Sequence, residues 1–350
     1  MIEVKINSQE KTYPIIIENQ AISDLKEKIL SFIEGKNYIV VISQKVEKLY
    51  GKILNFDNKF ILKDGEKHKN FKNYKKILEF ALKLKLKRTD AIVAIGGGVV
   101  GDLAGFAAST YMRGVDFIQV PTTLLACVDS SVGGKTAIDT DFGKNLVGTF
   151  YQPKAVLINP KFLKTLDERQ FKTGLGEVVK YSFIEKSCLL EEEVNLTNFL
   201  TEKYEQIIER DEKTLSKLIE ICIKLKKSVV EKDEKEAGLR RILNFGHTYG
   251  HAIEKITNYK KFTHGEAIVE GMKFAFNFAL KKNLIDKNYK FLAEDVIKKY
   301  NFREISKFNM KKMIDLMKSD KKATSDKIVF ILPNGYSQVD VFEIDAEELY

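Results

Sequence analysis

The run AIVAIGGG, residues 91–98, limits the possible folds of this chain more than any other segment. Five apolar residues without a polar interruption are typical of a strand that is buried on both faces, as in a parallel sheet covered by helices. Three glycines follow at once, and the small and apolar residues after them predict a helix that begins at about Val99. The segment therefore predicts the strand, tight turn and helix from which α/β folds are built.

The rest of the chain divides into two regions of different texture. Strand-like runs in the first region lie at residues 1–6, 13–17, 38–42, 59–63, 117–120 and 155–158, with helical patterns near 70–87 and after 101. This alternation predicts a Rossmann-like α/β domain at residues 1–160, with a mostly parallel sheet and an N-terminal hairpin. Periodic segments up to about residue 319 predict an all-α domain at residues 161–350, with a short terminal hairpin at 328–333 and 338–342. We expect the active site in the cleft between the two domains.

Composition excludes several classes of protein. No apolar run approaches the roughly 20 residues of a membrane helix, and the N-terminus lacks the layout of a signal peptide, so we expect a cytoplasmic protein. The three cysteines are far apart and never form a CxxC pair, which argues against a disulfide framework or a thiolate zinc site. The net charge of +9 comes mostly from lysines that lie on the solvated faces of helical patterns. Without a nucleic-acid motif, this charge fits an anionic small substrate better.

Two glycine-containing segments could bind phosphate. Gly96, Gly98 and Gly101 match GxGxxG, and a helix N-terminus after glycines suits a pyrophosphate. The acidic residue expected about 20 residues later is misplaced, because Asp116 precedes its strand, so a turn used only for tight packing is the alternative. The second segment, DSSVGGKTAID with the following GKN, fails the P-loop pattern but suits phosphate or carboxylate recognition.

Three of the four histidines fall in one short stretch, at His247, His251 and His264. The i, i+4 spacing places His247 and His251 on one face of a helix, without the glutamate of an HExxH protease motif. Glu177 is the best carboxylate candidate, with Lys180 one turn later on the same face. Two imidazoles and a carboxylate predict a catalytic metal site with an open coordination position. Spacing leaves open which two histidines bind, and a chance cluster of histidines is the alternative.

Six segments together resemble the 3-dehydroquinate synthase family over nearly the whole chain: GGGVVGDLAGFAAS, RGVDFIQVPTTLLACVDSSVGGKTAID, GKNLVGTFYQPKAVLINPKFLKTL, GLGEVVKYS, GLRRILNFGHTYGHAIE and HGEAIVEGM. The resemblance implies an NAD-binding domain at residues 1–160 and a metal- and substrate-binding helical domain at 161–350. It further implies a homodimer with one zinc or cobalt ion in each site. The implied substrate is 3-deoxy-D-arabino-heptulosonate 7-phosphate, which would be converted to 3-dehydroquinate and phosphate in aromatic amino acid biosynthesis.

The resemblance also implies roles for individual residues. The implied metal ligands are Glu177, His247 and His264, which makes His251 catalytic rather than ligating. The implied substrate and catalytic residues are Arg113, Asp129, Lys135, Asn145, Lys180, Lys226, Arg240 and Asn244, with Lys321 or Lys322 in addition. The implied cofactor contacts are Asp64, Glu66, Lys69, Gly98, Val99, Val100, Gly101, Asp102, Thr122, Thr123, Lys135, Lys144, Phe162, Leu163, Lys164 and Thr165.

Few positions depart from the family pattern. Cys127 stands where glutamine is expected, His68 where tyrosine is common, and Ser43 where some members carry an acidic or amide contact to the ribose. Another sugar phosphate cyclase of the same fold is the nearest rival, and an iron-type polyol dehydrogenase or a non-catalytic binding protein is the more distant one. Arg113, Lys226 and Arg240 favour a substrate that carries a carboxylate as well as a phosphate.

Overall fold

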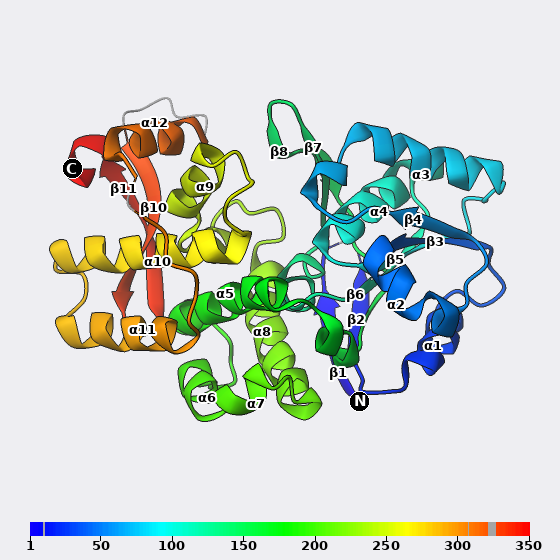
Figure 1. Ribbon diagram of the computed structural model, residues 1–350, viewed down its shortest axis with the longest axis horizontal. Helices are drawn as coiled ribbons and strands as arrows, with labels where there is room; N and C mark the ends of the chain where they lie inside the picture. The colour runs from blue at the N-terminus through cyan, green and yellow to red at the C-terminus, as the bar shows by residue number, and fades with distance from the viewer. Residues whose placement is uncertain (10, 307, 321–326) are drawn as a thin grey trace. The chain divides into compact units, whose positions relative to one another are not determined.

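The computed structural model describes residues 1–9, 11–306, 308–320 and 327–350, which fold as two units (Figure 1). The first unit comprises Met1–Leu166 and Arg210–Ile223, and the second comprises Asp167–Glu209 and Lys224–Tyr350. The sequence predicted a single domain boundary, after residue 160. In the structure the first boundary follows Leu166, and a later segment, Arg210–Ile223, also belongs to the first unit. That segment contains Arg210, whose guanidinium donates hydrogen bonds to the carbonyls of Leu163, Lys164 and Leu166.

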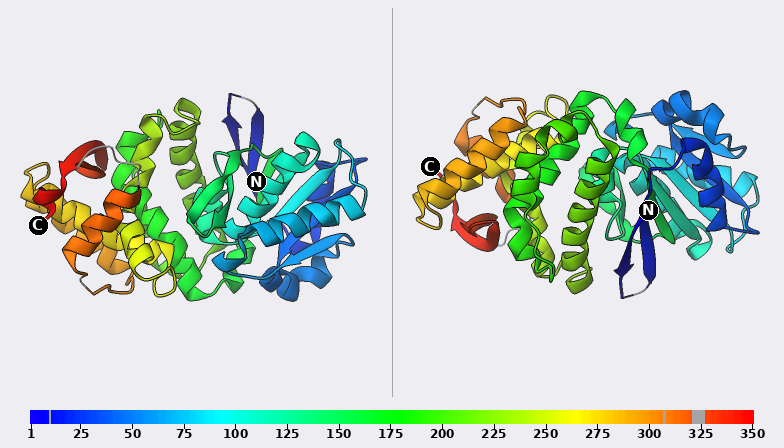
Figure 2. Two further views of the ribbon diagram at one scale, coloured as in Figure 1. Left: turned by 90° about the horizontal axis from the view of Figure 1, so that it is seen from above. Right: turned by 90° about the horizontal axis from the view of Figure 1, so that it is seen from below.

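A seven-stranded sheet in the order β1-β2-β9-β6-β5-β3-β4 organises the first unit. Only β1 and β2 pair antiparallel, as the N-terminal hairpin that projects in both views of Figure 2. All other neighbours pair parallel, which confirms the predicted Rossmann-like α/β fold. The strands are β1 (Ile2–Asn7), β2 (Thr12–Ile17), β3 (Tyr38–Ser43), β4 (Lys59–Leu62), β5 (Ala91–Gly96), β6 (Asp116–Pro121) and β9 (Ala155–Ile158).

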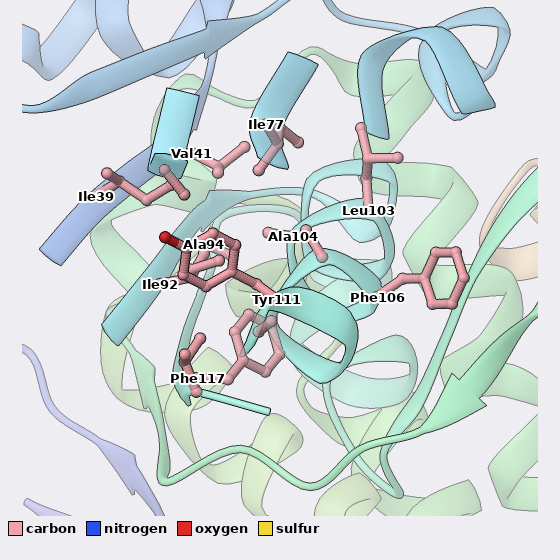
Figure 3. Packing of buried hydrophobic residues seen from close by; sticks show 14 of the residues in the cluster. Ile39, Val41, Ile77, Ile92, Ala94, Leu103, Ala104, Phe106, Tyr111 and Phe117 are labelled. Carbon is pink, nitrogen blue, oxygen red and sulfur yellow. The ribbon is translucent and has the colours of Figure 1, made fainter. Parts of the chain in front are cut away.

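Helices cover both faces of this sheet because alternate strand residues point to opposite faces. Ile39 and Val41 face one core, and Val40 and Ile42 face the other. The first core lies under α3 (Phe71–Lys83) and α4 (Gly98–Thr110), as Figure 3 shows at close range. The second core lies under α1 (Leu25–Ser31) and α2 (Gln44–Leu54). The uninterrupted apolar strands of the sequence are thus buried on both sides.

A second, two-stranded sheet in this unit was not predicted. Part of the segment predicted to recognise phosphate or carboxylate forms β7 (Lys135–Thr140), which pairs antiparallel with β8 (Gly143–Phe150). Gly148 permits this pairing, because a Cβ there would lie 2.1 Å from the carbonyl oxygen of Thr136. The hairpin carries Phe142 and Leu146, which are 95% and 62% exposed.

The second unit is mainly helical, as predicted, and ends in the predicted hairpin of β10 (Lys327–Gly335) and β11 (Gln338–Asp345). Its helices are α5 (Glu168–Ile184), α6 (Leu196–Glu202), α7 (Tyr204–Ile208), the end of α8 (Glu212–Lys232), α9 (His247–Ile256), α10 (His264–Lys281), α11 (Lys287–Lys299) and α12 (Met310–Asp320). Among the described helices, none combines the length and the apolar character needed to cross a membrane. All three cysteines are buried and outside disulfides.

Candidate functional site

Glu177, His247 and His264 come together in the second unit, from the helices α5, α9 and α10. Glu177 Oε1 lies 3.2 Å from His264 Nε2 and 3.7 Å from His247 Nε2. One potential ligand atom from each of the three residues lies within 4.8 Å of the others. The predicted carboxylate and two of the predicted histidines thus converge on one point.

Glycines make this convergence possible, because they let the three helices touch backbone to backbone. A Cβ on Gly265 would lie 2.2 Å from the carbonyl oxygen of Thr173 in α5. A Cβ on Gly271 in α10 would lie 1.9 Å from the carbonyl oxygen of Gly246, the residue before His247. Real Cβ atoms do not approach backbone oxygens so closely, so any larger residue at these glycines would separate the helices that carry the ligands.

His247 is oriented by the backbone. Its Nδ1 lies 3.1 Å from the carbonyl oxygen of Phe245, and a carbonyl can only accept, so Nδ1 carries the hydrogen. Burial lowers the pKa of His247 to about 3, despite the nearby carboxylate of Glu177, so the ring is neutral. A neutral ring protonated at Nδ1 presents the lone pair of Nε2 toward Glu177, which is the form that binds a metal.

Glu177 is fully buried, and its carboxylate lies among positive groups. Lys180, which is 1% exposed, pairs with Oε2, while Oε1 faces the two histidines. Burial alone would raise the pKa of Glu177, but Lys180 and the imidazoles lower it well below its usual value. Apart from these ion pairs, no described residue donates a hydrogen bond to either carboxylate oxygen. A buried anionic oxygen that faces two imidazole nitrogens fits a divalent cation.

His264 is the first residue of α10, and its backbone is held by a capping box of Thr263 and Glu266. Arg169 of α5 donates two hydrogen bonds to the carboxylate of Glu266, at 3.0 and 2.9 Å. Burial opposes protonation of the His264 ring, but Glu254 and Glu177 raise its pKa to about 10. The site therefore attracts positive charge at the position where a metal ion would supply it.

His251 lies beside the predicted ligands, as its helical spacing indicated. Its ring centroid is 5.3 Å from that of His247 and 6.2 Å from that of His264. His251, Glu254 and His264 form a second group whose ligand atoms are close enough to hold a metal. The geometry alone thus leaves two overlapping ligand sets, which share His264.

Buried cations in the second unit suit an anionic substrate. Lys226 and Arg240 are 6% and 2% exposed, in addition to Lys180. The loop before Arg240 is shaped by Asp233, which accepts hydrogen bonds from the backbone of Ala237, Gly238 and Arg240. Asn244, also predicted to contact substrate, donates to the carboxylate of Glu236 at 2.7 Å. Asp233 was not predicted, because no recognisable motif includes it, although it lies only seven residues before Arg240.

The glycine turn of the first unit lies where the sequence predicted it, at the carboxyl end of β5 with α4 beginning at Gly98. Thr122 donates its backbone N–H to the carbonyl of Gly96, and the side chain of Thr123 lies against Gly97. The predicted contacts Gly98 to Asp102, Thr122 and Thr123 are therefore adjacent. Val100 differs from the other predicted contacts, because its side chain is buried in the hydrophobic core.

Lys69 joins several of the predicted cofactor and substrate residues into one network. Its ammonium group lies 2.6 Å from Asp102 and 3.7 Å from Glu66, and it also donates to Asn145 Oδ1. Burial disfavours the charged form, but Asp102 and Glu66 raise the pKa of Lys69 above its usual value. The backbone of Asn145 has φ 55° and donates to Asp139, a residue that the sequence analysis did not single out.

The remaining first-unit candidates lie around α2 and the segment after β9. Asp64 accepts a hydrogen bond from the backbone of Lys45, and Ser43 Oγ caps α2 by accepting from Val46. Phe162 and Leu163 are buried, so only Lys164 and Thr165 of that run present side chains toward solvent. Asp129 lies in the single helical turn at 126–130, and Lys135 and Lys144 lie in the β7–β8 hairpin. Lys321 and Lys322 lie outside the described residues.

Arg113 is separated from the other first-unit candidates. It follows the 13-residue helix α4, which runs from the glycine turn at the carboxyl end of β5 to the amino end of β6. A helix of that length spans about 20 Å. Met112, Arg113 and Gly114 all have positive φ, at 49°, 62° and 116°, so the backbone there is held in an uncommon conformation.

A pocket below the glycine turn contains two polar residues that were not predicted individually, Gln119 and Ser131. They are 6% and 4% exposed, and Gln119 Oε1 and Ser131 Oγ have no hydrogen-bond partner among the described residues. Gly101 leaves space for the Gln119 amide, since a Cβ there would lie 3.2 Å from Nε2. A polar residue inside the apolar run FIQV was the available signal for Gln119.

One known family is similar to this chain over most of its length. A family model described as 3-dehydroquinate synthase N-terminal matches residues 59–173, and one described as 3-dehydroquinate synthase C-terminal matches residues 174–323. A 3-dehydroquinate synthase of Alkaliphilus metalliredigens is 41% identical over 356 aligned residues, which cover 100% of this chain and 97% of the relative.

Two solved structures resemble the whole chain. A 2-deoxy-scyllo-inosose synthase complexed with carbaglucose-6-phosphate, NAD⁺ and Co²⁺ is 27% identical, with a TM-score of 0.86 over 99% of this chain and 98% of that one. A 2-epi-5-epi-valiolone synthase from Streptomyces hygroscopicus, with NAD⁺ and Zn²⁺ bound, has a TM-score of 0.85 over 98% and 96% of the two chains. It is 21% identical, so this second likeness shows the fold alone.

Proposed function

The chain belongs to the 3-dehydroquinate synthase family, and from this membership we propose that it is an NAD- and metal-dependent lyase that converts 3-deoxy-D-arabino-heptulosonate 7-phosphate to 3-dehydroquinate and phosphate. The convergence of Glu177, His247 and His264 beside the buried Lys180 is the observation that carries this proposal. A mixed carboxylate and imidazole site beside buried cations suits a substrate that is both hydroxylated and anionic.

The cofactors have matching sites in the two units. Glu177, His247 and His264 would hold one zinc or cobalt ion, and the glycine turn with Lys69 and its neighbours would hold NAD. NAD supplies a hydride acceptor that returns the hydride within the same turnover, and the metal ion supplies polarisation of the hydroxyl that is oxidised. Gln119 and Ser131 are further candidates for contacts to the cofactor or to its ordered water, because their buried polar atoms face the pocket below the turn.

The chain's own residues bind and orient the substrate. Lys180, Lys226 and Arg240 are buried cations, and together they would neutralise the phosphate and the carboxylate of the substrate. Lys135, Lys144 and Asn145 of the β7–β8 hairpin, with Asp129 and Asn244, would fix its remaining polar groups. His251 would carry a proton between the substrate hydroxyl and the departing phosphate. A rival cyclase whose substrate lacks a carboxylate would need fewer buried cations.

A homodimer of cytoplasmic subunits is part of the proposal. Arg113 lies near the amino ends of the parallel strands, whereas the glycine turn lies at their carboxyl ends. Arg113 would therefore serve a site only when supplied by a second copy. The exposed Phe142 and Leu146 on the β7–β8 hairpin are consistent with a surface that another subunit covers. Three buried cysteines without disulfides suit a reducing compartment.

The activity is tested by phosphate release from the heptulosonate phosphate, with NAD and either zinc or cobalt present. We expect phosphate to accumulate, chelation to stop the reaction, and absorbance at the NADH band to show no net rise. NADH formed in equal amount to product would indicate a polyol dehydrogenase instead. Turnover only of a sugar phosphate without a carboxylate would indicate another cyclase, and binding without turnover of either substrate would indicate a binding protein.

The role of Arg113 is tested by mixing two inactive variants. Arg113→Ala and Glu177→Ala are each expected to be inactive, and subunit exchange between them should restore part of the activity. Restoration occurs because one site of each mixed dimer would then have an intact Arg113 and an intact Glu177. If mixing restores nothing although exchange is demonstrated by mass spectrometry, Arg113 does not act from a second copy.

A further inference from the structure

His264 contacts two carboxylates through different nitrogen atoms. Its Nε2 lies 3.2 Å from Glu177 Oε1, and its Nδ1 lies 3.6 Å from Glu254 Oε2. Glu254 is 5% exposed and belongs to α9, three residues after His251 and seven after His247. The close approach of Gly250 to α10, where a Cβ would lie 3.0 Å from the carbonyl oxygen of Ala267, brings this part of α9 against α10.

We propose that Glu254 is a positioning residue that orients His264 as a metal ligand, an inference that rests on the metal site of the proposed function. A neutral imidazole has one nitrogen that donates and one that accepts. Because a carboxylate only accepts, Glu254 would keep the hydrogen on Nδ1 when a metal ion displaces the proton of Nε2, so that the lone pair of Nε2 faces Glu177 and the metal position. The negative charge of Glu254 also makes the ring a more basic and therefore stronger ligand.

The two histidine ligands are thus oriented in the same way by different acceptors. His247 uses the backbone carbonyl of Phe245, which no side-chain substitution removes. His264 uses a side chain, so its orientation can be tested by mutation. The capping box of Thr263 and Glu266 fixes the backbone of His264 independently, so a change at Glu254 alters the ring and leaves the start of α10 in place.

The same geometry argues against Glu254 as a ligand of the same ion. Glu177 and Glu254 face opposite ring nitrogens of His264, so a single ion bound at Nε2 lies away from Glu254. An ion held by His251, Glu254 and His264 would instead lie on the Nδ1 side of His264, as a second and separate site. The number of ions bound per chain distinguishes this arrangement from the proposed one.

The experiment measures zinc and cobalt affinity of the purified full chain by competition with a chelator, together with the number of ions per chain. We expect one ion per chain in the parent and in Glu254→Gln, with the dissociation constant raised about 10- to 100-fold in the variant. The visible absorption of bound Co²⁺ should also change, because the ring of His264 is less firmly oriented. Glu254→Asp should weaken binding less, since it keeps the charge at a greater distance.

Glu185→Gln is the matched control, because it neutralises another buried carboxylate of this unit, one that accepts from the backbone of Leu196. Its metal affinity should equal that of the parent. Circular dichroism and thermal unfolding of the metal-free proteins report any folding defect, and Glu254→Asp carries the test if Glu254→Gln does not fold.

Three results would overturn the inference or its premise. A metal affinity of Glu254→Gln within about threefold of the parent, with the Co²⁺ spectrum unchanged, shows that Glu254 does not position His264. Loss of one of two ions in Glu254→Gln shows that Glu254 is itself a ligand. A parent protein that binds neither zinc nor cobalt contradicts the proposed function and not merely the role of Glu254.

Discussion

The glycines of the turn in the first unit and those between the helices of the second unit have different uses. At Gly97 and Gly98 of the first unit, an added Cβ would meet the side chains of Thr123 and Ser130 at 3.0 and 3.1 Å. At Gly265 and Gly271 of the second unit, it would meet backbone oxygens at 2.2 and 1.9 Å. Side chains can move by a few tenths of an ångström, whereas packed helix backbones cannot. The first set therefore keeps a surface open for a ligand, and the second set holds helices together.

This difference predicts separable defects. Changes in the second unit should affect the metal and leave NAD binding intact, and changes at the glycine turn should do the reverse.

Glu177→Ala should abolish phosphate release and stoichiometric metal binding, because it removes the ligand that faces both histidines and breaks the buried ion pair with Lys180. The dissociation constant for NAD, measured by fluorescence titration, should change less than about threefold. His247→Ala and His264→Ala should lose metal in the same way. If Glu177→Ala and His247→Ala both retain full metal by elemental analysis while His264→Ala loses it, the ligand set is the other group, which contains His251 and Glu254.

Gly271→Ala should destabilise the second unit by about 1–3 kcal/mol or more, because its Cβ has no space beside Gly246. Thermal unfolding and metal affinity should both fall, since separating α9 from α10 moves His247 away from His264. Gly335→Ala is the control, because its nearest neighbour would lie at 3.5 Å, an ordinary contact. An unchanged metal affinity in a destabilised Gly271→Ala would show that helix contact does not set the ligand geometry.

His251→Asn should keep both metal and NAD but lower kcat by roughly 10²-fold, the scale for losing a positioned acid or base. This result would show that His251 acts in the chemical step and not in binding of the metal or of NAD. Steady-state kinetics with metal analysis provide the measurement. Turnover within a few-fold of the parent, in a variant that retains its metal, contradicts the proton-transfer role, and loss of metal makes His251 a ligand.

Gly98→Ala should have the smallest effect, a roughly tenfold weaker NAD affinity with unchanged metal content, because a methyl group would crowd the approach of a pyrophosphate to the turn. Ser130 can yield in part, so the fold should survive. Equilibrium titration with NAD and elemental analysis check both halves of this expectation. A loss of metal in Gly98→Ala would contradict the independence of the two sites.

Local patterns predicted much of this molecule. The buried strand before the glycines, the start of α4 and the terminal hairpin were all visible as apolar periodicity and turn residues. Helical spacing also predicted that Lys180 would lie beside Glu177 and that His251 would lie beside His247. The same spacing places Glu254 on the face of His247 and His251, at i+7 and i+3, and it could have indicated that residue as well.

Local order along the chain is enough to identify its family, its α/β and helical regions and the residue types available for a metal site, because each of these can be recognised from short segments. The packing of the helices settled which nitrogen of His264 faces which carboxylate. The tertiary structure also decided that Arg113 lies a helix length from the glycine turn. These features depend on the contact of α5, α9 and α10 through glycines, and on the direction of α4 across the sheet, which bring together or separate residues far apart in sequence.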